Sequence, residues 1–269
     1  MPEAPDLEAI RAFFTARICG VPIRSAEIRV PIVARFSRDA FAAELIGTSV
    51  ATIERRGKFL LFALATGRVL TVNPMLTGRF QYVSAAERLR AKTCAVVEFA
   101  SGCQLRYVDT KVMGKLYLVD EAGLASVPQF AEMGPDVLDP SLTEAEFSRR
   151  IRRHPGMVKS ILTNHRFVAG IGNAYADEIL FAAGVHPYRK RSQMSDCEVR
   201  TLHEAMGAVM TWATPIVAEQ MRDGLVYEEW RAHLRVHGKG GQPCPVCGNP
   251  ISEITAGQRL TNFCRRCQQ

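Results

Sequence analysis

The sequence lacks any uninterrupted run of about eighteen apolar residues, the length that a membrane-spanning helix needs. Its first segment, residues 1–20, mixes acidic and basic side chains among the apolar ones, which is not the pattern of a secretory leader. Internal repeats and low-complexity stretches are also missing. We therefore expect a globular intracellular protein of the cytoplasm, without a membrane segment.

A basic tail is missing as well. Lysine and arginine number 34 against 27 aspartates and glutamates, a net charge of +7, yet neither half of the chain divided after Pro135 is a basic tail. An excess of positive charge suits a polyanionic partner, because each neutralised phosphate releases condensed counterions. Binding to such a partner is expected to need both halves. With 47% hydrophobic residues in 269, the chain has room for two domains.

Cysteine is present but unevenly placed. Four of the eight cysteines are scattered along the chain and four fall within the last 26 residues. In the second group, Cys244 and Cys247 form one C-x2-C knuckle, and Cys264 and Cys267 form another, with sixteen residues between the two knuckles. Two such knuckles predict one tetrahedral Zn²⁺ site. Four thiolates leave no open position for water, so we expect this zinc to be structural.

Four reduced cysteines that merely lie near one another are the alternative. Pro245, Gly248 and Pro250 supply the tight turns that a metal knuckle needs, which favours zinc.

Hydrophobic patterning changes along the chain. Residues 5–20 have helical spacing, and residues 22–119 contain short β-type runs separated by glycine turns, which is typical of a sandwich or barrel. A segment rich in glycine and proline, residues 121–140, has the composition of a linker. The remainder has helical patterning, so we expect an α+β protein.

Two capping boxes mark helix starts in the second half. Thr143 is followed by Glu146, and Ser195 is followed by Glu198. Pro215 is expected to kink or end the second of these helices.

The chain begins Met1-Pro2-Glu3, and removal of Met1 would leave Pro2 with a free secondary amine. An α-amine has a pKa near 8, against about 10.4 for lysine, so far more of it is neutral and nucleophilic near pH 7. Attack by a secondary amine on a sugar C1′ forms a charged iminium, an electron sink for elimination. Glu3 could move the protons. Many proteins begin Met-Pro, so this dipeptide alone means little.

Four motifs occur in order along almost the whole chain. They are Pro2-Glu3 followed by Pro5 and Asp6, the triplet Arg56-Gly57-Lys58, the run from Gly170 to Glu178, and the cysteine ribbon with Gln258-Arg259. Together they resemble the formamidopyrimidine-DNA glycosylase and endonuclease VIII family of base-excision repair enzymes.

The resemblance implies two structural domains with damaged duplex DNA in the cleft between them. Residues 1–120 would form an N-terminal helix and β-sandwich, and 121–140 a linker. Residues 141–235 would form a helix-two-turn-helix domain, and 236–269 a zinc-ribbon finger. It also implies a monomeric enzyme that works on the nucleoid.

By the same resemblance Pro2 is the Schiff-base nucleophile. Glu3 is the general acid/base that helps to open the sugar. Lys58, at the tip of a β-turn, would face the damaged nucleotide and its phosphate. Taken alone, Lys58 would be read as an exposed lysine in a hairpin.

Lys159, Asn173 and Arg259 would hold the phosphates that flank the lesion. Asn173 opens an expected helix, residues 174–183, whose free N–H groups suit an anion. The glycine pair before it could equally be a helix cap, and it is no dinucleotide fingerprint because no strand precedes it. Arg259 falls between the knuckles, where a guanidinium can grip a phosphate in bidentate fashion. A solvated arginine is its alternative reading.

An enzyme that flips a base out of the stack must fill the gap. In the family a methionine and an arginine-x-phenylalanine pair do this, whereas here Leu76, Lys111 and Met113 occupy those positions. Leucine can still act as a wedge, but lysine lacks the fork of arginine and methionine is less rigid than phenylalanine. We therefore expect weakened discrimination of the base opposite the lesion. Asp6 replaces a usual glutamate, and His237 a common tyrosine.

Three further basic runs are more typical of solvated faces, and we do not assign them to the site. They are Arg149-Arg150, Arg152-Arg153 and Arg189-Lys190-Arg191.

The expected activity is a bifunctional DNA glycosylase and abasic-site lyase that removes oxidised bases and cuts the strand by β,δ-elimination. Oxidised purines such as 8-oxoguanine and formamidopyrimidines are favoured, and oxidised pyrimidines are the alternative. Two rival readings are a non-catalytic protein that binds damaged DNA and an RNA-binding or ribosome-associated protein. The presence of Pro2, Glu3 and Lys58 argues against the first. The second would bind RNA at least as well as duplex DNA.

Overall fold

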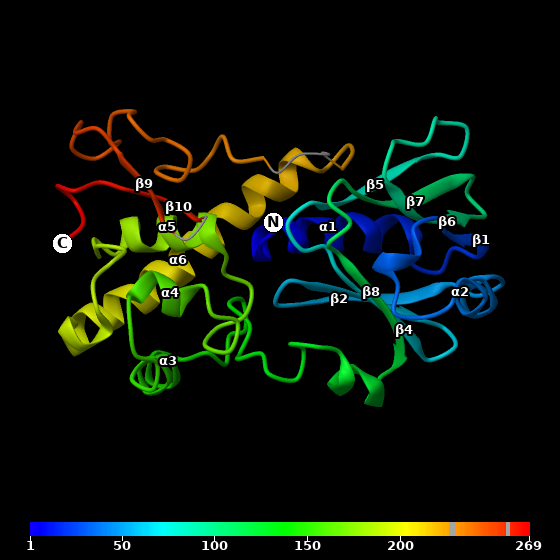
Figure 1. Ribbon diagram of the computed structural model, residues 1–269, viewed down its shortest axis with the longest axis horizontal. Coiled ribbons are helices and arrows are strands. Elements are labelled where there is room, and N and C mark those ends of the chain that lie inside the picture. Colours follow the sequence, from blue (N-terminus) through cyan, green and yellow to red (C-terminus); the bar gives the residue numbers. More distant parts are fainter. Residues whose placement is uncertain (226–229, 257–258) are drawn as a thin grey trace. The chain divides into compact units, whose positions relative to one another are not determined.

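The computed structural model describes residues 1–225, 230–256 and 259–269, and it divides into two compact units (Figure 1). Unit 1 comprises residues 1–131 and 217–230, and unit 2 comprises residues 132–216 and 231–269. No helix in these described ranges is long and apolar enough to cross a membrane. The domain boundaries expected from the sequence remain predictions.

Unit 1 combines helices with eight antiparallel strands. Its helical elements are α1 (Ala4–Ile18), η1 (Pro31–Val33), α2 (Arg38–Leu45) and η2 (Ala122–Ser126). Its strands are β1 (Ile23–Ile28), β2 (Val50–Arg56), β3 (Phe59–Leu64), β4 (Arg68–Asn73), β5 (Gly78–Ser84), β6 (Thr93–Phe99), β7 (Cys103–Asp109) and β8 (Lys115–Asp120). They form two four-stranded sheets in the orders β1-β6-β7-β5 and β2-β3-β4-β8.

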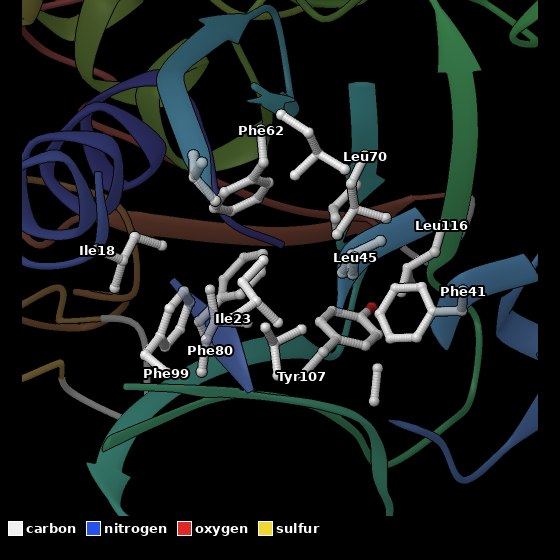
Figure 2. A pocket seen from close by; sticks show the side chains of 16 residues that line it. Ile18, Ile23, Phe41, Leu45, Phe62, Leu70, Phe80, Phe99, Tyr107 and Leu116 are labelled. Carbon is white, nitrogen blue, oxygen red and sulfur yellow. The ribbon is translucent and has the colours of Figure 1, made fainter. Parts of the chain in front are cut away.

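The two sheets and α1 enclose one apolar core. Phe62 of β3 and Phe80 of β5 come from different sheets, and their ring centroids lie 6.5 Å apart. Phe14 of α1 lies 6.0 Å from the first ring and 5.9 Å from the second. Figure 2 shows Phe62 and Phe80 directed into this core, where an apolar cavity of only about 20 Å³ remains. Each fully buried phenylalanine contributes about 1.5–3 kcal/mol, so this packing fixes α1 on the sheets.

Unit 2 is helical and ends in a small hairpin. Its helices are α3 (Glu144–Ile151), α4 (Val158–Leu162), α5 (Asn173–Ala182), η3 (Arg191–Gln193) and α6 (Asp196–Gln220), and the hairpin pairs β9 (Ser252–Ala256) with β10 (Arg259–Phe263). α6 belongs to both units, because the division falls between Ile216 and Val217. The expected α+β class is therefore confirmed.

Both capping boxes form at the expected helix starts. The Thr143 hydroxyl accepts the Glu146 N–H at 3.3 Å in front of α3. The Ser195 N–H donates to Glu198 Oε2 at 2.8 Å in front of α6. Pro215 does not end α6, which continues for five residues to Gln220.

Candidate active site

The N-terminus is held rigidly ahead of α1. Glu3 is the N-cap residue of this helix, and its backbone N–H donates to Asp6 Oδ2 at 2.8 Å. Pro5, in the first turn, has its φ angle already set for a helix. Pro2, Glu3 and Asp6 are all buried. The candidate nucleophile and the candidate general acid/base therefore occupy fixed positions, two and one residues before the helix.

The turn that carries Lys58 is tied to the same helix. Arg55 Nε of β2 lies 3.2 Å from Glu8 Oε2 of α1, and Arg55 Nη1 donates to the Gly57 carbonyl at 3.0 Å. Gly57 has a φ of +57°, which glycine adopts without strain. Arg55 therefore links the turn that precedes the half-buried Lys58 to α1, the helix that follows Pro2 and Glu3.

Two loops of unit 1 carry the candidate wedge residues, and one carboxylate joins them. Asp109, which is fully buried, accepts the Gly114 N–H through Oδ2 at 2.7 Å and the Val112 N–H through Oδ1 at 3.1 Å. The Thr77 hydroxyl, from the other loop, also donates to Oδ1. Because both loops hydrogen bond to one carboxylate, their positions are coupled.

The hydroxyl group of Tyr107 contacts residues next to both loops. Its hydroxyl lies 3.2 Å from Asp109 Oδ2 and 3.4 Å from the Pro74 carbonyl. Burial, and then the charge of Asp109, raise the pKa of Tyr107, so the hydroxyl stays protonated and can donate. A Cβ on Gly114 would stand 1.7 Å from this hydroxyl, and one on Gly78 would stand 2.1 Å from it. Only glycine fits at both positions.

The three candidate wedge residues differ in exposure. Leu76 and Lys111 are exposed at the surface, whereas Met113 is half-buried. The loops turn through Met75 with a φ of +50° and Val112 with a φ of +55°. A left-handed backbone at a β-branched residue stores strain, which is common at binding sites.

In unit 2, Lys159 and Asn173 meet at the ribbon hairpin. Asn173 Nδ2 donates to the Leu260 carbonyl of β10 at 2.6 Å, and Lys159 Nζ donates to the same oxygen at 3.1 Å. Lys159 Nζ also donates to Thr261 Oγ1 at 2.8 Å and lies 2.7 Å from Asp177 Oδ1. An ammonium group has three donors, so a direct phosphate contact requires Lys159 to exchange one of these partners.

A hollow of about 230 Å³ lies beside these two residues. Its lining includes Lys159, Asn173, Tyr188 and Thr261. The buried Asn173 Oδ1 and Tyr188 hydroxyl have no hydrogen-bond partner among the described residues. The hollow therefore offers polar groups and the charge of Lys159 to an anion.

Arg259 begins β10, and its backbone pairs with Ala256. Its side chain lies outside the described part of the chain, as do residues 257 and 258. Its expected phosphate contact stays a prediction.

Two adjacent carboxylates of α5 hold the segment before the ribbon. Asp177 Oδ2 lies 2.7 Å from His237 Nδ1 and accepts the Asn262 N–H at 3.1 Å. Glu178 accepts three successive N–H groups, at 2.9–3.0 Å, from residues 235–237. Burial raises the pKa of Glu178, and these three backbone bonds counter the shift. The pair therefore fixes the ribbon to α5.

The four terminal cysteines form a metal centre. Their Sγ atoms all lie within 4.8 Å of one another, with Cys247 and Cys264 at 3.5 Å and Cys244 and Cys267 at 3.9 Å. Zn–S bonds of about 2.3 Å at tetrahedral angles place sulfurs about 3.8 Å apart, so the four sulfurs fit one Zn²⁺. Without a cation, the Cys247 thiol, and then burial, raise the pKa of Cys267 to about 12. A divalent cation removes that penalty, and the centre is the expected structural zinc site.

Sequence reasoning missed Arg55, Asp109, Asp177 and Glu178. Asp177 and Glu178 stand inside the quoted Gly170–Glu178 run, which was the available signal. Asp109 directly precedes the segment that carries Lys111 and Met113. Arg55 directly precedes the Arg56-Gly57-Lys58 triplet.

Three family profiles match consecutive parts of the chain. They are the formamidopyrimidine-DNA glycosylase N-terminal domain at residues 1–116, the formamidopyrimidine-DNA glycosylase H2TH domain at 133–223, and the zinc finger found in FPG and IleRS at 241–269. Together they cover most of the sequence.

Curated relatives match over their full length or nearly so. The formamidopyrimidine-DNA glycosylase of Geobacillus kaustophilus is 35% identical, with 100% of both chains covered. That of Symbiobacterium thermophilum is 37% identical, with 100% of this chain and 89% of the relative covered.

Solved structures of Lactococcus lactis Fpg have the same fold. Its complex with DNA containing an abasic site has a TM-score of 0.91 at 27% identity, with 99% of both chains covered. Its complex with DNA containing an N7-benzyl-Fapy-dG has a TM-score of 0.91 at 28% identity, with 100% of both covered.

Proposed function

Because the chain belongs to the formamidopyrimidine-DNA glycosylase family, we propose that it uses the amine of Pro2 to excise oxidised bases from duplex DNA and to cut the strand. The observation that carries this proposal is the buried, capped start of α1. There Pro2 and Glu3 precede the helix, and Asp6 fixes the backbone of Glu3. The Lys58 turn is tied to the same helix through Arg55.

Removal of Met1 converts the amide nitrogen of Pro2 into a secondary amine. The positive end of the α1 dipole disfavours its protonated form, which keeps a lone pair for attack. This nitrogen bonds to C1′ of the damaged nucleotide and loses its proton, and the base leaves with the electron pair of the glycosidic bond and takes up a proton. Glu3 protonates the sugar ring oxygen as the ring opens, which produces a cationic iminium.

The iminium then accepts electrons from C2′. Loss of a C2′ proton expels the 3′ phosphate, and a second elimination expels the 5′ phosphate. Water hydrolyses the product from the nitrogen and regenerates the amine. Lys58 places positive charge beside the nucleotide and its phosphate during these steps.

Leu76, Lys111 and Met113 would fill the space that the flipped nucleotide vacates. Asp109 couples the two loops that carry them, so the wedge would act as one piece. Lys111 carries a point charge at a position where an arginine would form paired hydrogen bonds with a base. This difference supports weak discrimination of the base opposite the lesion.

Lys159, Asn173 and Arg259 would hold phosphates on either side of the lesion. The polar hollow beside Lys159 and Asn173 supports this role for the first two. We favour oxidised purines such as 8-oxoguanine and formamidopyrimidines as substrates, with oxidised pyrimidines as the alternative, and a monomeric enzyme.

The test is borohydride trapping of the protein, freed of Met1, on duplex DNA with one abasic site. A covalent adduct is expected, because borohydride reduces the iminium to a stable amine. A variant with one extra N-terminal residue should give none, since its Pro2 nitrogen is an amide. If the protein binds this DNA but forms no adduct, the proposed enzymatic function is wrong. The protein is then a non-catalytic protein that binds damaged DNA.

A further inference from the structure

A second hollow in unit 2, of about 460 Å³, gathers basic side chains from two distant segments. Arg152 and Arg153 follow α3, and Lys190 and Arg191 adjoin η3. No acidic residue lines it. The two basic runs lie far apart along the chain, with 35 residues between Arg153 and Arg189, so their meeting could not be predicted from the sequence.

In the structure, some basic residues of these runs pair with carboxylates and others do not. Arg149 Nη2 lies 2.7 Å from Glu146 Oε1, and Arg189 Nη1 lies 2.6 Å from Glu198 Oε1. Each of these two arginines is therefore paired with a glutamate in the first turn of a helix.

The cations of the hollow are different. Arg152 reaches Asp196 at 2.9 Å, in a pair that is more than half exposed on both sides. Arg153, Lys190 and Arg191 have no acidic partner among the described residues. Positive charge without neighbouring carboxylates attracts an anion from solution.

The backbone that presents these cations is held by hydrogen bonds. Arg191 N–H donates to the Gly156 carbonyl at 2.9 Å, and Val158 N–H donates to the Arg189 carbonyl at 2.9 Å. An antiparallel bridge joins Met157 to Lys190. The basic residues are therefore displayed on a fixed pair of segments, so binding does not require the segments to order.

Arg191 supplies an independent sign of a ligand. Its Nε is buried, and no hydrogen-bond partner for it exists among the described residues. A buried guanidinium N–H without a partner is unfavourable, and an anion oxygen would supply the missing acceptor. Burial, and then Arg150, lower the pKa of His154 in the lining, so the charge comes from the arginines and the lysine.

The hollow lies close along the chain to the candidate phosphate residues. Gly156 lines the basic hollow, and Lys159 lines the neighbouring one. Three residues of extended chain reach at most about 11 Å. One DNA strand carries a phosphate every 3.4 Å of axis, so both hollows can hold phosphates of one strand a few nucleotides apart.

We propose that Arg152, Arg153, Lys190 and Arg191 form an additional phosphate-binding site, which takes the backbone of the DNA strand beyond the phosphates next to the lesion. This rests on the proposed function for the identity of the polyanion. The site lengthens the DNA footprint and strengthens binding independently of the base removed.

The first experiment measures the salt dependence of binding to an abasic-site duplex. The variant is Arg153→Gln with Lys190→Gln. The control is Arg149→Gln with Arg222→Gln, which removes the same charge from arginines already paired with acidic neighbours. Loss of two phosphate contacts should reduce the slope of log K against log salt by about two, whereas the control should change it by less than about half a unit. An unchanged slope in the first variant overturns the proposal.

The second experiment replaces single phosphates by neutral methylphosphonates along each strand. At one position a few nucleotides from the lesion, the replacement should weaken the wild type and the control about threefold and leave the double variant almost unaffected. Equal effects on all three proteins at every position overturn the site. If a glutamate-rich peptide instead distinguishes wild type from variant while DNA does not, the hollow binds acidic protein and the proposal is wrong.

Borohydride trapping at low salt separates this proposal from the function on which it rests. The double variant should still form the adduct with saturating DNA, because the basic hollow touches none of the reacting atoms. If the wild type forms no adduct, the proposed enzymatic function is wrong. The salt dependence of binding still tests the phosphate-binding site, because it does not depend on the chemical reaction.

Discussion

The backbone N–H of Gly114 donates to Oδ2 of Asp109 over 2.7 Å. The other oxygen of this carboxylate accepts from Val112 and from Thr77 of the facing loop. One fully buried side chain thus fixes both loops that carry the wedge residues, although none of the atoms involved contacts DNA by the proposed mechanism.

Asp109→Asn should uncouple these loops. An amide replaces one acceptor oxygen by a donor, which leaves at least one buried N–H or hydroxyl unsatisfied, at a cost of about 1–3 kcal/mol. We expect the free energy of unfolding in urea to fall by that amount. Excision of an oxidised base should slow about tenfold, since 1.36 kcal/mol of lost positioning corresponds to that factor.

Adduct formation at a preformed abasic site should slow less, because no stacked base has to be extruded. Asp120→Asn is the control, since among the described residues that exposed carboxylate accepts one hydrogen bond, from the Gly123 N–H at 2.7 Å. Equal losses in the two variants would contradict the role given to Asp109.

Gly114→Ala should destabilise unit 1 by about 1–3 kcal/mol, because the new Cβ would stand 1.7 Å from the Tyr107 hydroxyl. Adding Tyr107→Phe should restore part of the loss, because it removes that oxygen. Gly207→Ala should instead stabilise the protein by about 0.5–1 kcal/mol, because no described atom outside the local helix backbone and the chain neighbours lies within 4 Å of its Cβ position in α6. Urea unfolding measures all three, and a Gly114→Ala protein as stable as the wild type would refute the packing argument.

Cys247→Ser should reduce the zinc content from about one ion per chain to nearly none. Without the metal the ribbon loses its core, so β10 no longer positions the Leu260 carbonyl that Lys159 and Asn173 share. Affinity for an abasic-site duplex, measured by fluorescence anisotropy, should fall at least tenfold, about 1.4 kcal/mol. Cys197→Ser removes an exposed thiol outside the metal centre and should leave both measurements unchanged.

His154 should make the protein less stable in mild acid. Burial, and then Arg150, lower the pKa of His154, so the unfolded chain takes up this proton more readily than the folded one. Its contribution is therefore complete above the ordinary histidine value of about 6.5 and is lost as pH falls below it.

His154→Phe keeps a ring against Phe167, whose centroid lies 5.4 Å away, and removes the titration. Between pH 7.5 and 5.5 its melting temperature should fall by less than that of the wild type. An equal or larger fall would show that His154 does not supply this dependence.

Signals between near neighbours in sequence predicted their structures well. Thr143 with Glu146 and Ser195 with Glu198 cap helices as their spacing indicates, since each box is complete within four residues. The cysteine spacing likewise predicted the metal centre, because each knuckle is one turn.

Relationships between distant residues could not be predicted in the same way. Asp177 and His237 are 60 residues apart, and nothing in either local pattern pairs them. Lys159 was expected to hold a phosphate, and only the folded chain surrounds its ammonium group with three oxygen atoms. The fold also determines which arginines of the basic runs pair with a carboxylate, so residue type alone could not distinguish the paired arginines from the unpaired ones.

The return of the chain to unit 1 has a consequence for its synthesis. Val217 and Met221, both buried in the core that α1 and the sheets enclose, lie beyond the whole first segment of unit 2, residues 132–216. A ribosome adds about 5–20 residues per second, so roughly 5–20 s pass between completion of β8 and arrival of these two side chains. During that interval the nascent sandwich keeps an apolar gap, and the last part of its core is supplied by a helix that starts in the other unit.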